Sequence, residues 1–150
     1  MSDIIVIVIA VLIGGGILSI YIFFLITQQN LLKAIQPENR LMRPGQVWLQ
    51  LIPFFSWVWE FIVVTRISDS IRLEFQSRQQ DTILGFSDAQ AVEIVTERPA
   101  YGIGIATAVL NICSIIPVIG TYAGLASLIC MVVYWKKLSE FKRLIELRNA

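Results

Sequence analysis

The sequence contains no histidine and only two cysteines. Without histidine it lacks the commonest metal ligand and the commonest acid–base group at neutral pH. Cys113 and Cys130 both lie inside apolar runs. This position is typical of small buried hydrophobic side chains, whereas zinc and redox sites need close spacing and polar neighbours. The sequence also has no phosphate-binding loop, no glycine-rich dinucleotide turn and no nucleophile paired with a base. We therefore expect no enzyme activity, no cofactor and no metal site.

Charged residues are also scarce, at 15% of the chain, where a soluble domain carries roughly 25%. Hydrophobic residues make up 56%, and the formal net charge is only +1, which leaves no basic footprint for a nucleic acid. A chain of 150 residues is expected to form one domain. These values together predict a single membrane domain over residues 1–150, with the lipid bilayer as its main partner.

The first long apolar run covers residues 4–26 and is long enough to cross about 30 Å of hydrocarbon. No lysine or arginine precedes it, so it does not resemble a typical signal peptide. Asp3 stands before it and Lys33 after it. Because basic residues prefer the cytoplasmic side, these flanks predict a transmembrane helix with its N-terminus outside. Gly15 and Ser19 form a small-residue face for another helix; the alternative is that the glycines only make this helix flexible.

Residues 46–65 are apolar and rich in tryptophan, but Pro53 divides them. Proline cannot donate a backbone hydrogen bond and disfavours helix at the residue before it. A helix from Gln46 to Pro53 would extend only about 12 Å, part of the way into a bilayer. Residues 46–65 are therefore either one kinked span or a re-entrant hairpin whose tip lies at Pro53 to Ser56.

The distribution of basic residues bears on this choice. The twelve lysines and arginines fall into three groups: Lys33, Arg40 and Arg43; Arg66, Arg72, Arg78 and Arg98; and Lys136, Lys137, Lys142, Arg143 and Arg148. If residues 46–65 cross the bilayer, the second or the third group must lie outside, whereas a hairpin allows all three groups to be cytoplasmic. The preference of basic residues for the cytoplasm therefore favours the hairpin.

The rest of the chain predicts further helices. The first is an amphipathic helix at 66–80, which either lies on the membrane surface or continues straight out of the membrane. It is followed by a short helix at 88–98, transmembrane helices at 100–116 and 121–135, and a cytoplasmic helical extension at 136–148. The two later spans carry small residues four positions apart, at Gly104 and Ala108 and at Gly120 and Gly124. Such pairs let neighbouring helices approach closely.

Several segments between residues 44 and 70 carry a distinctive pattern. They are Pro44-Gly45-Gln46-Val47-Trp48-Leu49, Leu51-Ile52-Pro53, Val58-Trp59, Phe61-Ile62-Val63-Val64 and Arg66-Ile67-Ser68-Asp69-Ser70, and the range that contains them is about a fifth of the chain. This pattern resembles a signature of small uncharacterised bacterial multi-pass membrane proteins. The resemblance implies a location in the bacterial inner membrane, and it implies no activity.

Glu60 is the main candidate for a functional side chain, because a carboxylate at membrane depth commonly titrates, binds a cation or pairs with a positive charge such as Arg66. The alternative is structural: in the hairpin, Glu60 would lie near the start of a helix, where the helix dipole favours an anion. Gln50 and Asn111 are uncharged amides at membrane depth, and such groups commonly bond across helices. If they meet Glu60, the three side chains form a polar cluster; otherwise they serve only helix packing.

These observations predict an all-α membrane protein with three transmembrane helices, a re-entrant Pro/Trp-rich helical hairpin and cytoplasmic helical extensions, with its C-terminus in the cytoplasm. The alternative has four transmembrane helices. Because packing surfaces are plentiful and chemical groups are sparse, we expect a non-catalytic scaffold or accessory subunit. It would form homo-oligomers or bind a membrane-protein partner, to which it presents its cytoplasmic helices. The alternatives are a small oligomeric ion channel or transporter lined by the re-entrant segment, and a sensor of lipids or membrane shape.

Overall fold

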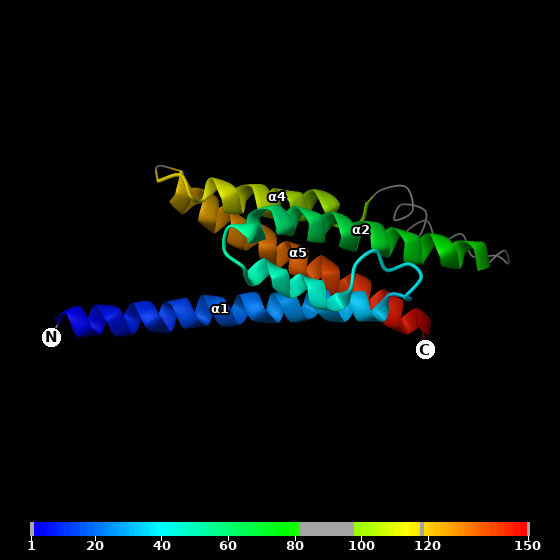
Figure 1. The fold of residues 1–150 in the computed structure, drawn as a ribbon, viewed down its shortest axis with the longest axis horizontal. Helices are drawn as coiled ribbons and strands as arrows, with labels where there is room; N and C mark the ends of the chain where they lie inside the picture. The colour runs from blue at the N-terminus through cyan, green and yellow to red at the C-terminus, as the bar shows by residue number, and fades with distance from the viewer. Residues whose placement is uncertain (1, 82–97, 118, 150) are drawn as a thin grey trace.

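The computed structural model describes residues 2–81, 98–117 and 119–149, and every regular element in this part of the chain is helical, as the sequence predicts. The elements are α1 (Ser2–Ala34), the 3-10 helix η1 (Pro44–Leu51), α2 (Phe55–Asp81), α4 (Tyr101–Cys113) and α5 (Gly120–Asn149). Helix α5 packs against both α1 and α4, and α4 packs against α2 (Figure 1). The predicted helix at 88–98 lies outside the described residues, apart from Arg98, which is not helical.

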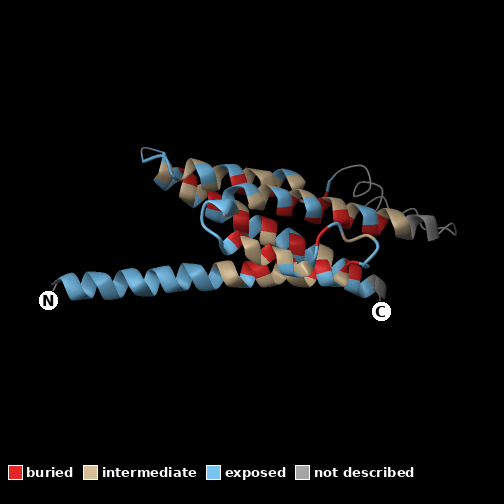
Figure 2. Ribbon diagram, viewed as in Figure 1, coloured by how far each residue is buried: buried red, intermediate tan, exposed pale blue. Residues whose placement is uncertain are grey.

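Helix α1 is divided into an exposed half and a packed half (Figure 2). Every side chain from Asp3 to Ile20 is exposed, whereas Phe24 and Leu31 are buried against the other helices. The N-terminal half extends past the rest of the bundle (Figure 1). The helix ends at Ala34, shortly before Pro37, which cannot continue a helix because it lacks a backbone N–H.

Of the described helices, only α1 is long enough and apolar enough to cross a membrane, over Asp3–Ala34. Membrane spans and signal sequences near an N-terminus share these properties. Helix α4 has 13 residues, or about 20 Å, and is shorter than the predicted span at 100–116. Helix α5 joins the predicted span at 121–135 and the predicted extension at 136–148 into one helix of 30 residues. The described fold is therefore all-α with one clear candidate span.

The chain reverses direction between η1 and α2, around the proline that divides residues 46–65 (Figure 1). Ile52 has an extended backbone, and Phe54 adopts a left-handed backbone with φ of 65°. The backbone N–H of Phe55 donates to the carbonyl of Pro53 at 2.8 Å, and that of Ser56 donates to the carbonyl of Ile52 at 2.9 Å. Left-handed backbone is uncommon outside glycine, so this turn holds Phe54 in an unfavourable conformation.

Helix α2 continues through the boundary that the sequence analysis places at Arg66. Segments 46–65 and 66–80 are therefore not separate elements: the first contains η1, the turn and the beginning of α2, and the second completes α2. The expected boundary follows the change from apolar to polar residues. That change alters which faces meet solvent, but no proline or glycine occurs between Phe55 and Asp81 to interrupt the backbone.

The hydrophobic core lies where the inner half of α1, η1, α2 and α5 meet. Its fully buried members come from all four elements: Leu31, Leu32, Val47, Val63, Ile67, Ile71, Tyr134 and Leu138. On α2 the buried positions recur at intervals of three and four residues, which is the spacing of one helix face. The buried stripe begins at Val63 and includes Glu74, and the partly buried Glu60 lies one turn before it.

The charged residues are segregated along the bundle. Segments 2–32, 44–65 and 101–135 contain no Asp, Glu, Lys or Arg except Asp3 and Glu60. In Figure 1 the N-terminus and the tips of the η1–α2 and α4–α5 hairpins point toward one end of the molecule. The end of α2, the loop after α1 and the C-terminus lie toward the other end. Glu60 is thus the one charged side chain that the apolar part of the bundle encloses.

Candidate functional site

Glu60 is held by side chains from two other helices. Asn111, near the end of α4, donates its Nδ2 group to both Oε1 and Oε2 of Glu60, at 3.1 Å each. Ser127 of α5 donates its Oγ to Oδ1 of Asn111 at 2.7 Å. These three residues, called the polar cluster below, form one hydrogen-bonded chain from α2 through α4 to α5.

Neutral donors and acceptors, rather than a cation, surround the carboxylate of Glu60. Ser127 is buried, and Glu60 and Asn111 are each partly buried. Ser114 donates its Oγ to the backbone carbonyl of Asn111 at 2.6 Å, which secures the end of α4 beneath the cluster. No ion pair involves Glu60 in the part of the chain that the structure describes, and Arg66, the expected partner, is exposed. The carboxylate is therefore positioned by hydrogen bonds alone.

The helix faces explain why these residues meet. Asn111 follows Gly104 and Ala108 on one face of α4, at intervals of four and three residues, and both are buried against neighbouring helices. Ser127 belongs to the corresponding face of α5, which continues through Met131. Small and polar side chains at these positions let the three helices approach closely enough for short side chains to bond.

Gln50 is not part of the polar cluster. Its Nε2 donates to Oε1 of Gln28 in α1 at 2.7 Å and to the carbonyl of Val47 at 3.2 Å. Gln28 and Gln50 are 1% and 3% exposed, so their amides form a second, separate polar contact inside the bundle. Oε1 of Gln50 is buried and has no hydrogen-bond partner among the described residues.

Three of the four tryptophan indoles also bond within the protein. Trp48 donates to Oε1 of Gln29 at 3.0 Å, Trp59 to the carbonyl of Gln46 at 2.9 Å, and Trp135 to Oγ1 of Thr27 at 2.8 Å. The first and third of these bonds attach η1 and α5 to α1. Trp57 instead is exposed at the hairpin tip, where it packs edge-on against Phe54.

The predicted helix-packing residues fall into two groups. Gly104 and Ala108 lie inside the bundle, and a methyl group built on Gly104 would be 2.5 Å from Cγ1 of Val64 and 3.1 Å from the ring of Tyr134. Among the described residues, a methyl group built on Gly15 would have nothing outside its own helix backbone within 4 Å, and Ser19 donates its Oγ to the carbonyl of Gly15 at 2.8 Å, within the same helix. The small residues of α4 thus allow close packing within the bundle, whereas no other helix in the described part of the chain packs against those of α1.

Gly120 and Gly124 lie at the start of α5, beside the connection from α4. The N–H of Gly120 donates to the carbonyl of Ile116 at 2.6 Å, and a methyl group at Gly120 would collide with the carbonyl of Ser114. A methyl group built on Gly124 would make only an ordinary van der Waals contact, 3.9 Å from Cβ of Ser114. Gly120, and not Gly124, is therefore the glycine that the tight α4–α5 turn requires.

Sequence reasoning placed Glu60 and Asn111 in one candidate cluster but did not include Ser127 or Gln28. The sequence gives little indication of either contact. A single serine within an apolar run, such as Ser127, and a glutamine just after an apolar run, such as Gln28, are both common. Chemically, the polar cluster offers one carboxylate that can accept a proton or a cation, with no nucleophile or second carboxylate bonded to it in the described residues. Among those residues no group of three or more potential metal ligands occurs.

Comparisons with protein-family models, with curated proteins and with solved structures found no match to this chain. The resemblance to small bacterial membrane proteins therefore stays a prediction.

Proposed function

We propose that this chain is a non-catalytic integral membrane protein that acts as a scaffold or accessory subunit. The observation that carries the proposal is the exposed apolar surface of the N-terminal half of α1. Its twelve large hydrophobic side chains between Ile4 and Ile20 are 49–69% exposed. Soluble monomers rarely expose contiguous apolar surfaces larger than a few hundred Å². Lipid, together with a helix of another subunit, is the environment that suits this surface.

The small residues of α1 form a face against which a helix of another molecule could pack. Gly14, Gly15 and Gly16 have open space around them, and Ser19 continues the face that includes Gly15. Small residues at such spacing let two helix backbones approach closely, and packing of this kind drives association inside a bilayer. In this proposal the face binds a second copy of the chain or another membrane protein.

The proposed placement follows the charge segregation. Helix α1 spans the bacterial inner membrane with its N-terminus outside, and the η1–α2 and α4–α5 hairpins enter from the cytoplasmic face. All lysines and arginines then lie on that face, in keeping with their known preference. The η1–α2 hairpin is re-entrant, and α4 and α5 form the second and third spans. Helix α4 is short for this role, so we expect local thinning of the bilayer around it.

The cytoplasmic ends of α2 and α5 are the surfaces offered to a partner. On α5 the side chains of Lys136, Lys137, Glu140 and Arg143 are exposed, while Leu138 keeps the helix attached to the core. This charged face is solvated in the isolated chain and accessible to a soluble or peripheral protein.

The proposal is tested by the oligomeric state of the full-length protein in lipid bilayers, measured by single-molecule photobleaching over a range of protein-to-lipid ratios. We expect a dimer or higher oligomer, and Gly15→Leu should weaken its association about tenfold by blocking close approach. Ala10→Leu is the matched control, because it adds a comparable volume on the opposite face of α1. A strictly monomeric protein that also co-purifies with no other membrane protein would contradict the proposal.

The polar cluster supports a second candidate function, ion or proton conduction by an oligomer. Glu60 is the one carboxylate enclosed by the apolar bundle, and a carboxylate at that depth commonly marks an ion pathway. Flux measured in proteoliposomes tests this function: Glu60→Gln should change ion selectivity or pH dependence, whereas Glu140→Gln, at an exposed position of α5, should not. No flux above that of empty liposomes would rule conduction out.

A further inference from the structure

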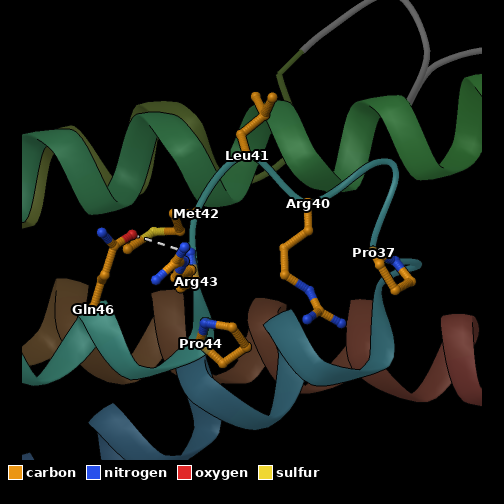
Figure 3. A pocket seen from close by; sticks show the side chains of 7 residues that line it. All are labelled: Pro37, Arg40, Leu41, Met42, Arg43, Pro44 and Gln46. Carbon is orange, nitrogen blue, oxygen red and sulfur yellow. Dashed lines mark hydrogen bonds between the residues drawn. The ribbon is translucent and has the colours of Figure 1, made fainter.

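A pocket of about 400 Å³ lies where the loop after α1 leads into η1 (Figure 3). Two arginines, Arg40 and Arg43, line it together with Pro37, Pro44 and Gln46, and no acidic residue does. Its charge is therefore positive, and its volume falls within the range of pockets that hold small molecules, about 300–1,000 Å³.

Arg40 is fixed in place with donors to spare. Its Nη2 donates to the carbonyl of Ile35 at 2.8 Å and to the carbonyl of Lys33 at 3.3 Å. These carbonyls belong to the end of α1, where the helix dipole favours a cation. A guanidinium has five N–H donors, and Nε of Arg40 is buried without a partner among the described residues. The end of α1 thus orients the guanidinium of Arg40, a residue that lines the pocket.

The loop that forms the pocket is held rigidly from the other side by α2. The buried carboxylate of Glu74 accepts from the N–H of Gln36 at 3.1 Å and from Nδ2 of Asn39 at 2.8 Å. Ser70 accepts from the N–H of Leu41 at 2.9 Å. Because side chains of α2 fix this backbone, little conformational entropy remains to be lost when a ligand binds.

The second arginine is also set by a local bond. The N–H of Arg43 donates to Oε1 of Gln46 at 3.0 Å, the one hydrogen bond drawn in Figure 3, and the side chain of Arg43 is exposed. Figure 3 shows Arg40 and Arg43 on neighbouring parts of the same loop. Arginine binds phosphate groups through paired, charge-assisted hydrogen bonds, which are stronger than those between neutral groups.

The position of the pocket along α1 identifies the ligand chemistry. The apolar run of α1 ends at Ile26, the polar residues Thr27 to Asn30 follow it, and the first charged residue after it is Lys33. In the proposed membrane placement the pocket therefore lies at the cytoplasmic boundary of the bilayer, at the depth of lipid phosphates. We propose that this pocket binds the phosphate group of an anionic phospholipid headgroup. Only the choice of a lipid as the source of the phosphate rests on the proposed membrane placement; oligomerisation is not required.

Binding is tested with the full-length protein in a non-ionic detergent, by native mass spectrometry. The probes are dioctanoyl phosphatidylglycerol, dioctanoyl phosphatidylcholine and inorganic phosphate, each titrated separately and then in competition. We expect phosphatidylglycerol to bind one molecule per chain and more tightly than phosphatidylcholine. Arg43→Gln should weaken this binding about tenfold, because one charge-assisted interaction is lost. Arg66→Gln, which removes an exposed arginine of α2 that does not line the pocket, should change it less than about twofold.

Competition distinguishes the two sources of phosphate. If inorganic phosphate displaces phosphatidylglycerol, the pocket accepts a soluble phosphate as well; if it does not, the pocket requires the lipid. Arg40→Lys retains the charge but loses the fork geometry, and its melting temperature shows whether α1 still ends correctly. Should Arg40→Lys fail to fold, Arg43→Gln alone decides. Equal weakening by Arg43→Gln and Arg66→Gln would overturn the proposal, as would equal binding of the two lipids.

Discussion

Asn111 donates to both carboxylate oxygens of Glu60 at 3.1 Å, although the two residues are 51 positions apart in the chain. This contact joins α4 to α2, and Ser127 extends it to α5. Burying a carboxylate in apolar surroundings is costly unless hydrogen bonds replace those of water. The polar cluster therefore fixes the relative position of three helices, and its contribution can be measured.

Replacement of Asn111 by leucine should destabilise the bundle. The variant leaves both oxygens of Glu60 and the hydroxyl of Ser127 without their partner, and we expect the free energy of unfolding to fall by about 1–3 kcal/mol. Reversible unfolding in mixed detergent micelles measures it. In a Glu60→Gln background the same substitution should cost less, because the charged partner is absent. An equal cost in both backgrounds would show that Asn111 acts through packing alone.

Gly104 should tolerate no larger residue, because its face of α4 touches α2 and α5. A methyl group there would lie 2.5 Å from Val64 and 3.1 Å from Tyr134, so we expect Gly104→Ala to lower the free energy of unfolding by about 1–3 kcal/mol. Gly102→Ala is the matched control: it has open space around it and should be neutral or stabilising by up to about 1 kcal/mol. Adding Val64→Ala to Gly104→Ala should recover part of the loss, and failure to do so would place the strain elsewhere.

Helix boundaries could be predicted from the sequence where a proline or glycine marks them. The end of α1 at Ala34 and the turn before α2 lie beside Pro37 and Pro53, whereas α4 ends at Cys113, three residues before the predicted end of its span at 116. The sequence leaves open whether the amphipathic helix at 66–80 continues straight from the preceding segment, because only a change in polarity marks Arg66. Such a change leaves backbone hydrogen bonding intact, so the helix runs on to Asp81.

The candidate cluster could be predicted only in part, for a geometric reason. Glu60 and Asn111 were grouped because both are polar at membrane depth, and their helices do bring them together. Gln50 was grouped on the same ground, but it lies in a 3-10 helix, where residues three positions apart share a face. Gln50 therefore follows the buried Val47 toward α1 and meets Gln28. Sequence spacing alone does not reveal which neighbouring helix a face will meet.

The proposed topology predicts that the segment after α2 and the C-terminus lie on the same side of the membrane. A reporter fused after Gly85, and a second one fused after Ala150, should both be cytoplasmic, because the η1–α2 hairpin returns to the face from which it enters. Fluorescence and periplasmic enzyme reporters at the same sites provide complementary signals. A reporter before Asp3 serves as the control and should be periplasmic. A periplasmic signal at Gly85 would mean that residues 46–65 cross the bilayer.

Removal of the Glu74 carboxylate should destabilise the loop that follows α1. Glu74 is 1% exposed and accepts from the N–H of Gln36 and from Nδ2 of Asn39, so Glu74→Ala removes the shared acceptor of two partly buried hydrogen bonds. We expect Glu74→Ala to lower the free energy of unfolding by about 2–3 kcal/mol. Glu74→Gln, which keeps one acceptor oxygen, should lower it less. Glu140→Ala, at an exposed site, is the control and should change it very little.

The same variant separates loop rigidity from direct contact in phosphate binding. Glu74 does not line the pocket, yet its two bonds hold the backbone on which Arg40 and Arg43 stand. Glu74→Gln should therefore weaken phosphatidylglycerol binding, because a looser loop loses more conformational entropy when the lipid binds. The substitution also removes a negative charge. If long-range electrostatic attraction set the affinity, Glu74→Gln would instead strengthen the binding. Hydrogen exchange at residues 36–46 should rise in parallel. Tighter binding by Glu74→Gln would mean that net charge, and not the shape of the loop, sets the affinity of the pocket.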